Sequence, residues 1–227
     1  MLATLLYLSL LNINAHMIRV GVVDTGLDIH DERFTSVLCP SGHKDFTGEG
    51  IEDTIGHGTH VTGLIKQYAG DSKEYCLVII KSFSKMAPAY VQLDQEVAAF
   101  RYAATLRLDY INYSAGGPGY NEAEFYAIAD HPYTTFIVAA GNDGKDLGEA
   151  GNRYYPASYN LPNIVAVGSE GSLTSNYGGP VSAFEHGDNV LSTLPKDQYG
   201  YMSGTSMAAA IHTGKLVKMQ LTVRGNE

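Results

Sequence analysis

The sequence predicts an α/β fold in which a mostly parallel sheet carries helices on both faces. Short, nearly continuous apolar runs rich in Val and Ile recur along the chain, as expected of buried parallel strands. Segments with helical spacing of apolar residues separate several of these runs, and this alternation is typical of a parallel sheet covered by helices. Of the 227 residues, 44% are hydrophobic and 17% are charged, which indicates a compact globular protein.

The predicted strands are short segments in which apolar and β-branched residues follow one another with few interruptions. In chain order they are residues 18–23, 37–39, 75–80, 110–114, 136–140 and 164–167. The segment 37–39 is the weakest of them because it is so short. The segment 110–114 runs into the glycine-rich residues 115–119, where an extended peptide could pair closely with the strand. Residues 169–203 are expected to be mostly loop, with 190–191 the most extended piece.

The predicted helices are segments with apolar residues three or four positions apart. They begin near His57, cover residues 93–108 and 122–129, and follow Ser206. The polar segment 41–53 is expected to be a surface loop, and the chain beyond about residue 220 is a polar tail.

The net charge is −9, from 15 Lys and Arg against 24 Asp and Glu, and no cluster of basic residues occurs. Nucleic acid is therefore not a predicted partner.

No repeat or linker interrupts residues 17–227, which are predicted to form a single domain. Residues 1–16 are either a weak signal sequence or an N-terminal extension, because their apolar run is too short to span a bilayer and lacks a basic start. The chain is expected to be secreted in the first case and cytoplasmic in the second. No membrane partner is predicted, and the oligomeric state is left open.

Cys39 and Cys76 are the two cysteines, too few for a disulfide scaffold. No Cys/His spacing suited to zinc occurs. Buried thiols are the ordinary interpretation of such residues in apolar segments. A bridge between neighbouring strands is the alternative if the chain is secreted.

Three polar residues stand at positions suited to chemistry. Asp24 follows a buried strand, at the end of a parallel sheet where functional groups gather, although a turn-closing Asp is the simpler interpretation. His57 and His60 lie three residues apart, but no third metal ligand accompanies them, so the alternative is one catalytic and one structural imidazole. Ser206 begins an Ala-rich helix, where a serine is either an ordinary cap or a nucleophile beside unpaired backbone N–H groups. An Asp, a His and a Ser in this order can build a nucleophilic triad.

Six segments carry a resemblance to a known family. They are residues 22–26 (Val-Val-Asp-Thr-Gly), 56–61 (Gly-His-Gly-Thr-His-Val), 112–117 (Asn-Tyr-Ser-Ala-Gly-Gly), 139–142 (Ala-Ala-Gly-Asn), 155–157 (Tyr-Pro-Ala) and 204–208 (Gly-Thr-Ser-Met-Ala). In this order, across roughly residues 18–215, the chain resembles the subtilisin-like serine proteases, or subtilases. The resemblance implies a subtilisin-like three-layer sandwich and a peptide or protein substrate.

The resemblance also implies a role for each matching residue. Ser206 would be the nucleophile, His57 the general base and then acid, and Asp24 the group that orients His57. Asn142 would donate its side-chain amide to the oxyanion, together with the backbone N–H of Ser206. The pocket for the residue that precedes the cleaved bond would have two walls, one of Ser114, Ala115 and Gly116 and the other of Ala139, Ala140 and Gly141.

The chain departs from the family pattern at several positions. Ala210 and Ile211 stand where the family usually has Pro and His, and neither side chain performs the chemistry. Tyr154 stands where many relatives have a small residue, so an inward-pointing ring would shorten the specificity pocket and favour small substrate residues. Relatives often carry a calcium-binding insertion after the helix that begins at His57; the loop is short here, so neither a calcium site nor a cofactor is predicted.

Two function hypotheses follow. The first is a serine endopeptidase that works through an acyl-enzyme. The second is a catalytically weak or silent module that binds peptides on the same fold. A dinucleotide-binding domain is disfavoured because the strand that ends at Asp24 is not followed by a Gly-x-Gly-x-x-Gly motif.

Overall fold

The computed structural model of the chain describes residues 16–225. Seven strands form one sheet in the order β2-β3-β1-β4-β5-β6-β7, and every neighbouring pair is parallel. These strands are β1 (Ile18–Asp24), β2 (Lys44–Asp45), β3 (Tyr75–Lys81), β4 (Tyr110–Tyr113), β5 (Thr135–Ala139), β6 (Ile164–Ser169) and β7 (Val181–Glu185). A separate antiparallel hairpin joins β8 (Val190–Leu194) to β9 (Gln198–Met202).

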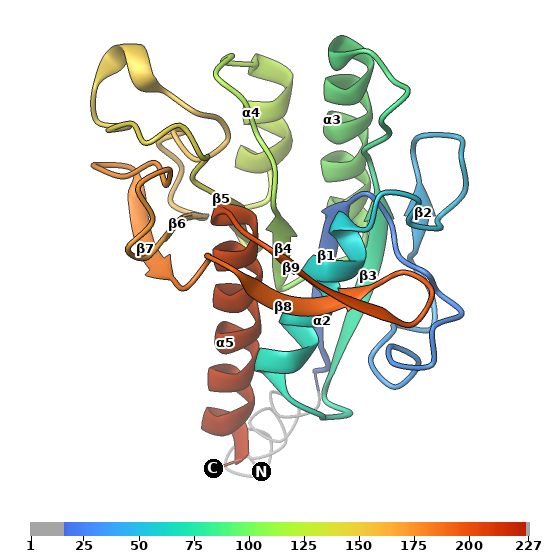
Figure 1. The fold of residues 1–227 in the computed structure, drawn as a ribbon. Coiled ribbons are helices and arrows are strands. Elements are labelled where there is room, and N and C mark those ends of the chain that lie inside the picture. The colour runs from blue at the N-terminus through green and yellow to red at the C-terminus, as the bar shows by residue number, and fades with distance from the viewer. Residues whose placement is uncertain (1–15, 226–227) are drawn as a thin grey trace, which may run out of the picture.

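Helices cover both faces of this sheet (Figure 1). One face carries α2 (His57–Ala69) and α5 (Thr205–Gly225), and the other carries α3 (Ala89–Thr105) and α4 (Glu122–Ala129). The alternation of side chains along β1 explains the two layers: Val20 and Val22 pack with the α2 side, whereas Val23 packs with the α3 side. The predicted sandwich with helices on both faces is confirmed.

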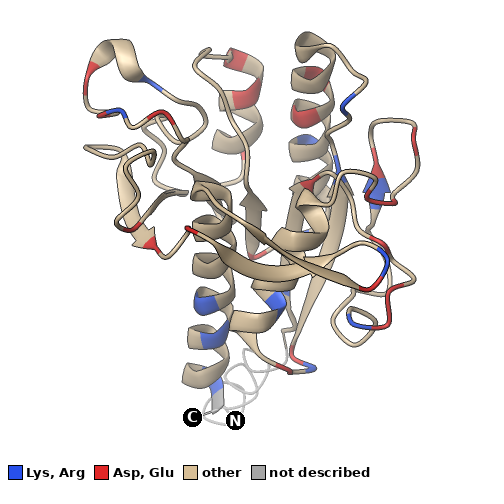
Figure 2. Cartoon of the chain, in the orientation of Figure 1, with Lys and Arg blue, Asp and Glu red and all other residues tan. Residues whose placement is uncertain are grey.

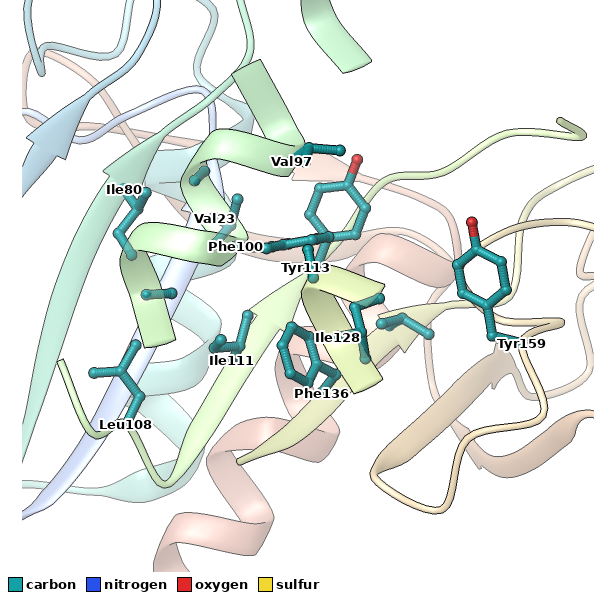
Figure 3. Packing of buried hydrophobic residues seen from close by; sticks show 14 of the residues in the cluster. Val23, Ile80, Val97, Phe100, Leu108, Ile111, Tyr113, Ile128, Phe136 and Tyr159 are labelled. Carbon is teal, nitrogen blue, oxygen red and sulfur yellow. The ribbon is translucent and has the colours of Figure 1, made fainter. Parts of the chain in front are cut away.

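Aromatic rings pack among aliphatic side chains in the core under α3 and α4 (Figure 3). Phe100 of α3 meets the ring of Tyr113 at 5.0 Å and that of Phe136 at 5.5 Å, both edge to face. Leu108 and Ile111 fill the same layer and are buried. This layer fixes the end of β4, from which the glycine-rich residues 115–119 continue.

Several sequence-based boundaries were wrong. The helix expected at 93–108 is α3, which begins earlier, at Ala89, and ends at Thr105. The residues 37–39 make only an isolated bridge, Leu38 to Leu77, whereas the short strand β2 lies inside the segment expected to be loop. The helix α5 continues to Gly225, beyond the start of the expected polar tail.

Residues 169–203 are more extended than expected: the predicted extended piece 190–191 begins β8, but β7 and β9 were not predicted. The reason is their position: β7 is the last strand of the sheet, and β9 pairs with β8 alone. Both strands leave much of their surface to solvent and therefore lack the continuous apolar run of a central strand.

A disulfide joins Cys39 to Cys76. It attaches the segment before β2 to the beginning of β3, beside the backbone bonds from Cys39 N to Leu77 O and from Leu77 N to Val37 O. The bridge that the sequence left as an alternative is therefore present. The weak signal or extension considered for residues 1–16 lies almost entirely outside the described residues. Within residues 16–225, no helix has the length and apolar character needed to cross a membrane.

Candidate active site

The candidate site lies at the point where the sheet changes its direction of winding. The strands that follow β1 in the chain, β2 and β3, lie on one side of it in the sheet. The strands that follow β4, from β5 to β7, lie on the opposite side, and β1 and β4 are neighbours. Between the carboxyl ends of two such adjacent strands a crevice opens, and ligands of open α/β sheets bind there. Asp24 ends β1 and Ser114 follows β4, so both residues stand at this crevice.

Asp24 and His57 are in direct contact. Nδ1 of His57 lies 2.8 Å from Oδ1 of Asp24, and the carboxylate is almost entirely buried. Oδ1 also accepts the N–H of Thr25 at 2.7 Å. The negative charge of Asp24 raises the pKa of His57 above its ordinary value, outweighing the opposite effect of burial. Because Nδ1 donates to the carboxylate, Nε2 is the nitrogen left to accept a proton.

A second buried carboxylate, Asp53, holds this arrangement together and was missed by the sequence analysis. Its oxygens accept the N–H groups of Ile55, Gly56 and Thr59 at 2.8–2.9 Å and the hydroxyls of Thr25 and Thr59. It thus satisfies the free N–H groups at the beginning of α2, where a negative charge is favourable. Its position four residues before His57 in a polar loop was the signal available.

The backbones of β1 and α2 also approach each other closely beside the Asp24–His57 pair. The hydroxyl of Thr25 accepts the N–H of Gly58 at 2.8 Å. A Cβ at Gly58 would collide with the carbonyl oxygen of Gly26, so only glycine permits this contact. The spacing of His57 from Asp24 therefore depends on Gly58.

Ser206 stands in the first turn of α5, as expected, and is bound to Ser114. Its hydroxyl donates to the carbonyl of Ser114 at 2.9 Å, and the Ser114 hydroxyl donates to the carbonyl of Ser206 at 2.9 Å. Among the hydrogen bonds of residues 16–225, none joins the Ser206 hydroxyl to His57. The structure thus brings Ser206 to the strand end that lines one cleft together with His57, with its hydroxyl turned toward Ser114.

Asn142 lies against the turn that precedes Ser206. Its Oδ1 accepts the N–H of Thr205 at 2.9 Å, which leaves Nδ2 as the group that can donate outward. The Thr205 hydroxyl in turn accepts the N–H of Gly141 at 3.1 Å. These two bonds connect the end of β5 to the beginning of α5. They hold the Asn142 amide beside the N–H groups of the first turn of α5.

The two segments expected to form pocket walls lie on either side of Tyr154. A Cβ added at Gly116 would meet the Tyr154 ring at 2.6 Å, and one added at Gly141 would meet it at 2.9 Å. Burial raises the pKa of Tyr154 to about 12. The ring therefore points inward and occupies the space between Gly116 and Gly141.

The other histidine, His60, is a structural residue. It is fully buried in α2, and its Nε2 lies 3.1 Å from the Val190 carbonyl and 3.2 Å from the Gly200 carbonyl, both in the β8–β9 hairpin. Burial lowers its pKa, so the neutral ring donates from Nε2. Of the two histidines, only His57 faces the cleft. Within residues 16–225 no group of three or more His, Cys, Asp or Glu side chains is arranged to hold a metal ion.

Comparison with known proteins shows the family to which the chain belongs. The profile of the Subtilase family matches residues 16–222. The chain is 35% identical over 221 residues to the major intracellular serine protease of Bacillus subtilis (strain 168), covering 88% of this chain and 67% of that protein. It is 31% identical over 221 residues to an intracellular serine protease of Paenibacillus polymyxa, covering 88% of this chain and 65% of that protein.

The fold is similar to that of a solved structure. The crystal structure of a cold-adapted subtilisin-like serine proteinase superposes with a TM-score of 0.76 at 27% identity, covering 93% of this chain and 78% of that one. The two curated relatives are longer than this chain, which spans about two thirds of each. From its motifs, its sheet and its relatives, this chain belongs to the subtilase family of serine proteases.

Proposed function

We propose that the chain is an endopeptidase that hydrolyses peptide bonds through an acyl-enzyme, with Asp24, His57 and Ser206 as its triad. The observation that carries the proposal is the 2.8 Å contact between Nδ1 of His57 and Asp24. It leaves Nε2 of His57 free to take the hydroxyl proton of a serine, and it stabilises the imidazolium that forms.

The hydroxyl of Ser206 must turn toward His57 before attack. Rotation about its Cα–Cβ bond replaces the hydrogen bond to the Ser114 carbonyl, which is worth about 1 kcal/mol. This is a small fraction of a catalytic barrier, and side-chain rotation is fast compared with turnover.

In the first half of the reaction Ser206 Oγ attacks the substrate carbonyl while His57 Nε2 takes the proton. The oxyanion receives hydrogen bonds from Asn142 Nδ2 and from the backbone N–H of Ser206, which α5 leaves unpaired at its N-terminus. His57 then gives its proton to the leaving amine, and the acyl-enzyme forms. In the second half water attacks the ester, and His57 acts again as base and then acid.

The substrate is proposed to be an extended peptide paired with Ser114, Ala115 and Gly116. Ala139, Ala140 and Gly141 form the opposite wall of the pocket for the residue that precedes the cleaved bond. Because the Tyr154 ring occupies the space between the walls, we expect this residue to be small, such as Gly, Ala or Ser. Equal cleavage of peptides with Ala and with Phe at this position would contradict the expectation.

A peptide-binding module without turnover is the alternative. The observation in its favour is that the Ser206 hydroxyl donates to Ser114 and makes no hydrogen bond to His57. The two functions differ in covalent chemistry, because only an activated serine reacts with a fluorophosphonate.

The test is fluorophosphonate labelling together with hydrolysis of a peptide that has Ala before the cleaved bond. We expect both in the wild type and neither in Ser206→Ala. Ser203→Ala is the matched control, because Ser203 is exposed three residues away and its hydroxyl accepts the N–H of Asn189. Labelling that survives in Ser206→Ala refutes the assigned nucleophile, and no labelling in the wild type favours the silent module.

A further inference from the structure

The cleft that contains His57 extends well beyond the triad. It has a volume of about 610 Å³ and continues past the glycine-rich residues 115–119 to the carboxyl groups of Glu96 and Glu124. Glu96 comes from α3 and Glu124 from α4, and both helices carry acidic residues in Figure 2. Neither glutamate has a part in the proposed triad.

The two glutamates face each other in a largely buried position. Glu124 is only 3% exposed, and the Tyr159 hydroxyl bonds its Oε2. Glu96 is partly exposed as a residue, yet its Oε1 is shielded from solvent and has no hydrogen-bond partner among residues 16–225. Burial, followed by the charge of Glu124, raises the pKa of Glu96 well above its usual range, and burial raises that of Glu124.

Within residues 16–225, the groups that contact these two carboxyl groups are hydroxyls and the carboxyl groups themselves, not cations. The residues that line the cleft include Asp24, Glu96 and Glu124 but no Lys or Arg. The Tyr113 hydroxyl also faces Glu96 and lowers its pKa, but the opposite effects of burial and of Glu124 are larger; burial raises the pKa of Tyr113 itself. A buried carboxyl group is costly to ionise without a cationic partner, and a guanidinium or ammonium group of a ligand lowers that cost by pairing with it.

We propose that Glu96 and Glu124 form a recognition site for a Lys or Arg side chain of the substrate, located upstream of the cleaved bond. This inference rests on the proposed function, because it assumes that a peptide lies along Ser114–Gly116. An extended peptide paired with a strand edge presents alternate side chains to the same wall. A residue upstream of the one beside Tyr154 can therefore reach the carboxyl pair at the far end of the cleft.

The competing interpretation is that the pair shares a proton and serves only packing between α3 and α4. In that case it would discriminate little between a basic and an apolar side chain of similar length. The unpartnered Oε1 of Glu96 and the opening of the cleft toward His57 favour recognition over packing.

The experiment is a peptide series with Ala before the cleaved bond and Arg, Lys, Leu or Glu at each of the positions further upstream. For the wild type we expect kcat/KM for Arg or Lys to exceed that for Leu by about tenfold or more at one position. In Glu96→Gln and in Glu124→Gln we expect the kcat/KM values for the basic peptide and for the Leu peptide to differ by no more than about threefold. The control is Glu122→Gln, an exposed residue in the first turn of the same helix as Glu124, which keeps the wild-type ratio.

Two outcomes overturn the inference: a wild type without a basic preference at any upstream position, or a preference that persists in the Gln variants. If Glu124→Gln fails to fold, Glu96→Gln alone decides, and the wild-type series remains decisive if neither variant folds.

Binding separates this inference from the proposed function. Anisotropy with labelled Arg and Leu peptides is measured on Ser206→Ala, which cannot turn them over. Selective binding of the Arg peptide without cleavage by the wild type would leave the inference standing while the proposed function fails. Cleavage by the wild type without any preference for basic residues would support the proposed function and overturn the inference.

Discussion

The two faces of the sheet contribute different kinds of residue to the same cleft. On the α2 and α5 face, backbones approach closely: a Cβ at Gly214 would lie 2.7 Å from the Ile65 carbonyl oxygen, so the helices that carry His57 and Ser206 are packed against each other. On the α3 and α4 face, the cleft is lined by long ionisable side chains, Glu96 and Glu124, with Tyr113 beneath them. Close backbone packing holds catalytic groups in one geometry, which every substrate requires. Side chains that line the cleft contact the substrate's own side chains and can therefore distinguish one substrate from another.

This comparison predicts two types of effect. Substitutions on the first face should lower turnover of all substrates alike, and substitutions on the second should change the ratio between substrates.

The largest expected effect is that of Asp24→Asn. We expect kcat to fall by about 10⁴, the magnitude for the equivalent change in a serine protease of another fold, and to fall equally for every peptide. The Asp24 charge is the main cause of the raised pKa of His57, and His57 must be neutral to act as a base. Activity is lost as pH falls through this pKa, so the acidic limb of the pH–rate profile should move to lower pH in the variant. A limb that stays in place or moves to higher pH would contradict the role of Asp24.

The next effect is that of Asn142→Ala, which removes the side-chain donor to the oxyanion. We expect a loss of about 10²–10³ in kcat with little change in KM, which is the magnitude known for the corresponding donor of a subtilisin, a member of the same family. Asn160→Ala, at an exposed position, is the control. A change confined to KM would indicate a binding role instead.

Tyr154→Gly tests the second face, because it removes the ring between Gly116 and Gly141. We expect kcat/KM for peptides with Phe before the cleaved bond to rise about tenfold or more relative to those with Ala. Tyr133→Gly is the control, since Tyr133 is 96% exposed. An unchanged Phe-to-Ala ratio would show that the ring does not limit the pocket.

The smallest effect concerns stability rather than turnover. Because the folded chain raises the pKa of Glu96, stability is highest below the ordinary glutamate pKa and falls as pH rises toward the raised value. The slope is at most about 1.4 kcal/mol per pH unit for one proton. Between about pH 5 and 8, the melting temperature should therefore fall less steeply with rising pH for Glu96→Gln than for the wild type. Asp94→Asn, at an exposed position on the same helix, should retain the wild-type slope, and an equally steep Glu96→Gln would contradict the burial of Glu96.

The central strands and the amphipathic helices could be predicted from the sequence because their apolar periodicity is local. The strand β1, the helix beginning at His57 and the helix over 122–129 were recovered in this way. The strands β7 and β9 were not, because a strand with one neighbour keeps polar residues and has no distinctive local pattern. Asp53 was missed for a similar reason: a carboxylate in a polar loop is ordinary until its five hydrogen-bond donors have been placed around it.

The sequence by itself determined the family and the proposed triad, since each of the three residues stands within a short contiguous motif that can be recognised from neighbouring residues alone. Only the tertiary structure decided that Cys39 pairs with Cys76, that the Ser206 hydroxyl points to Ser114, that the Tyr154 ring lies between two glycines, and that Glu96 meets Glu124 in the cleft. Each of these contacts joins residues with no short-range relation in the chain, because burial and charge at a given side chain depend on which distant segments fold against it.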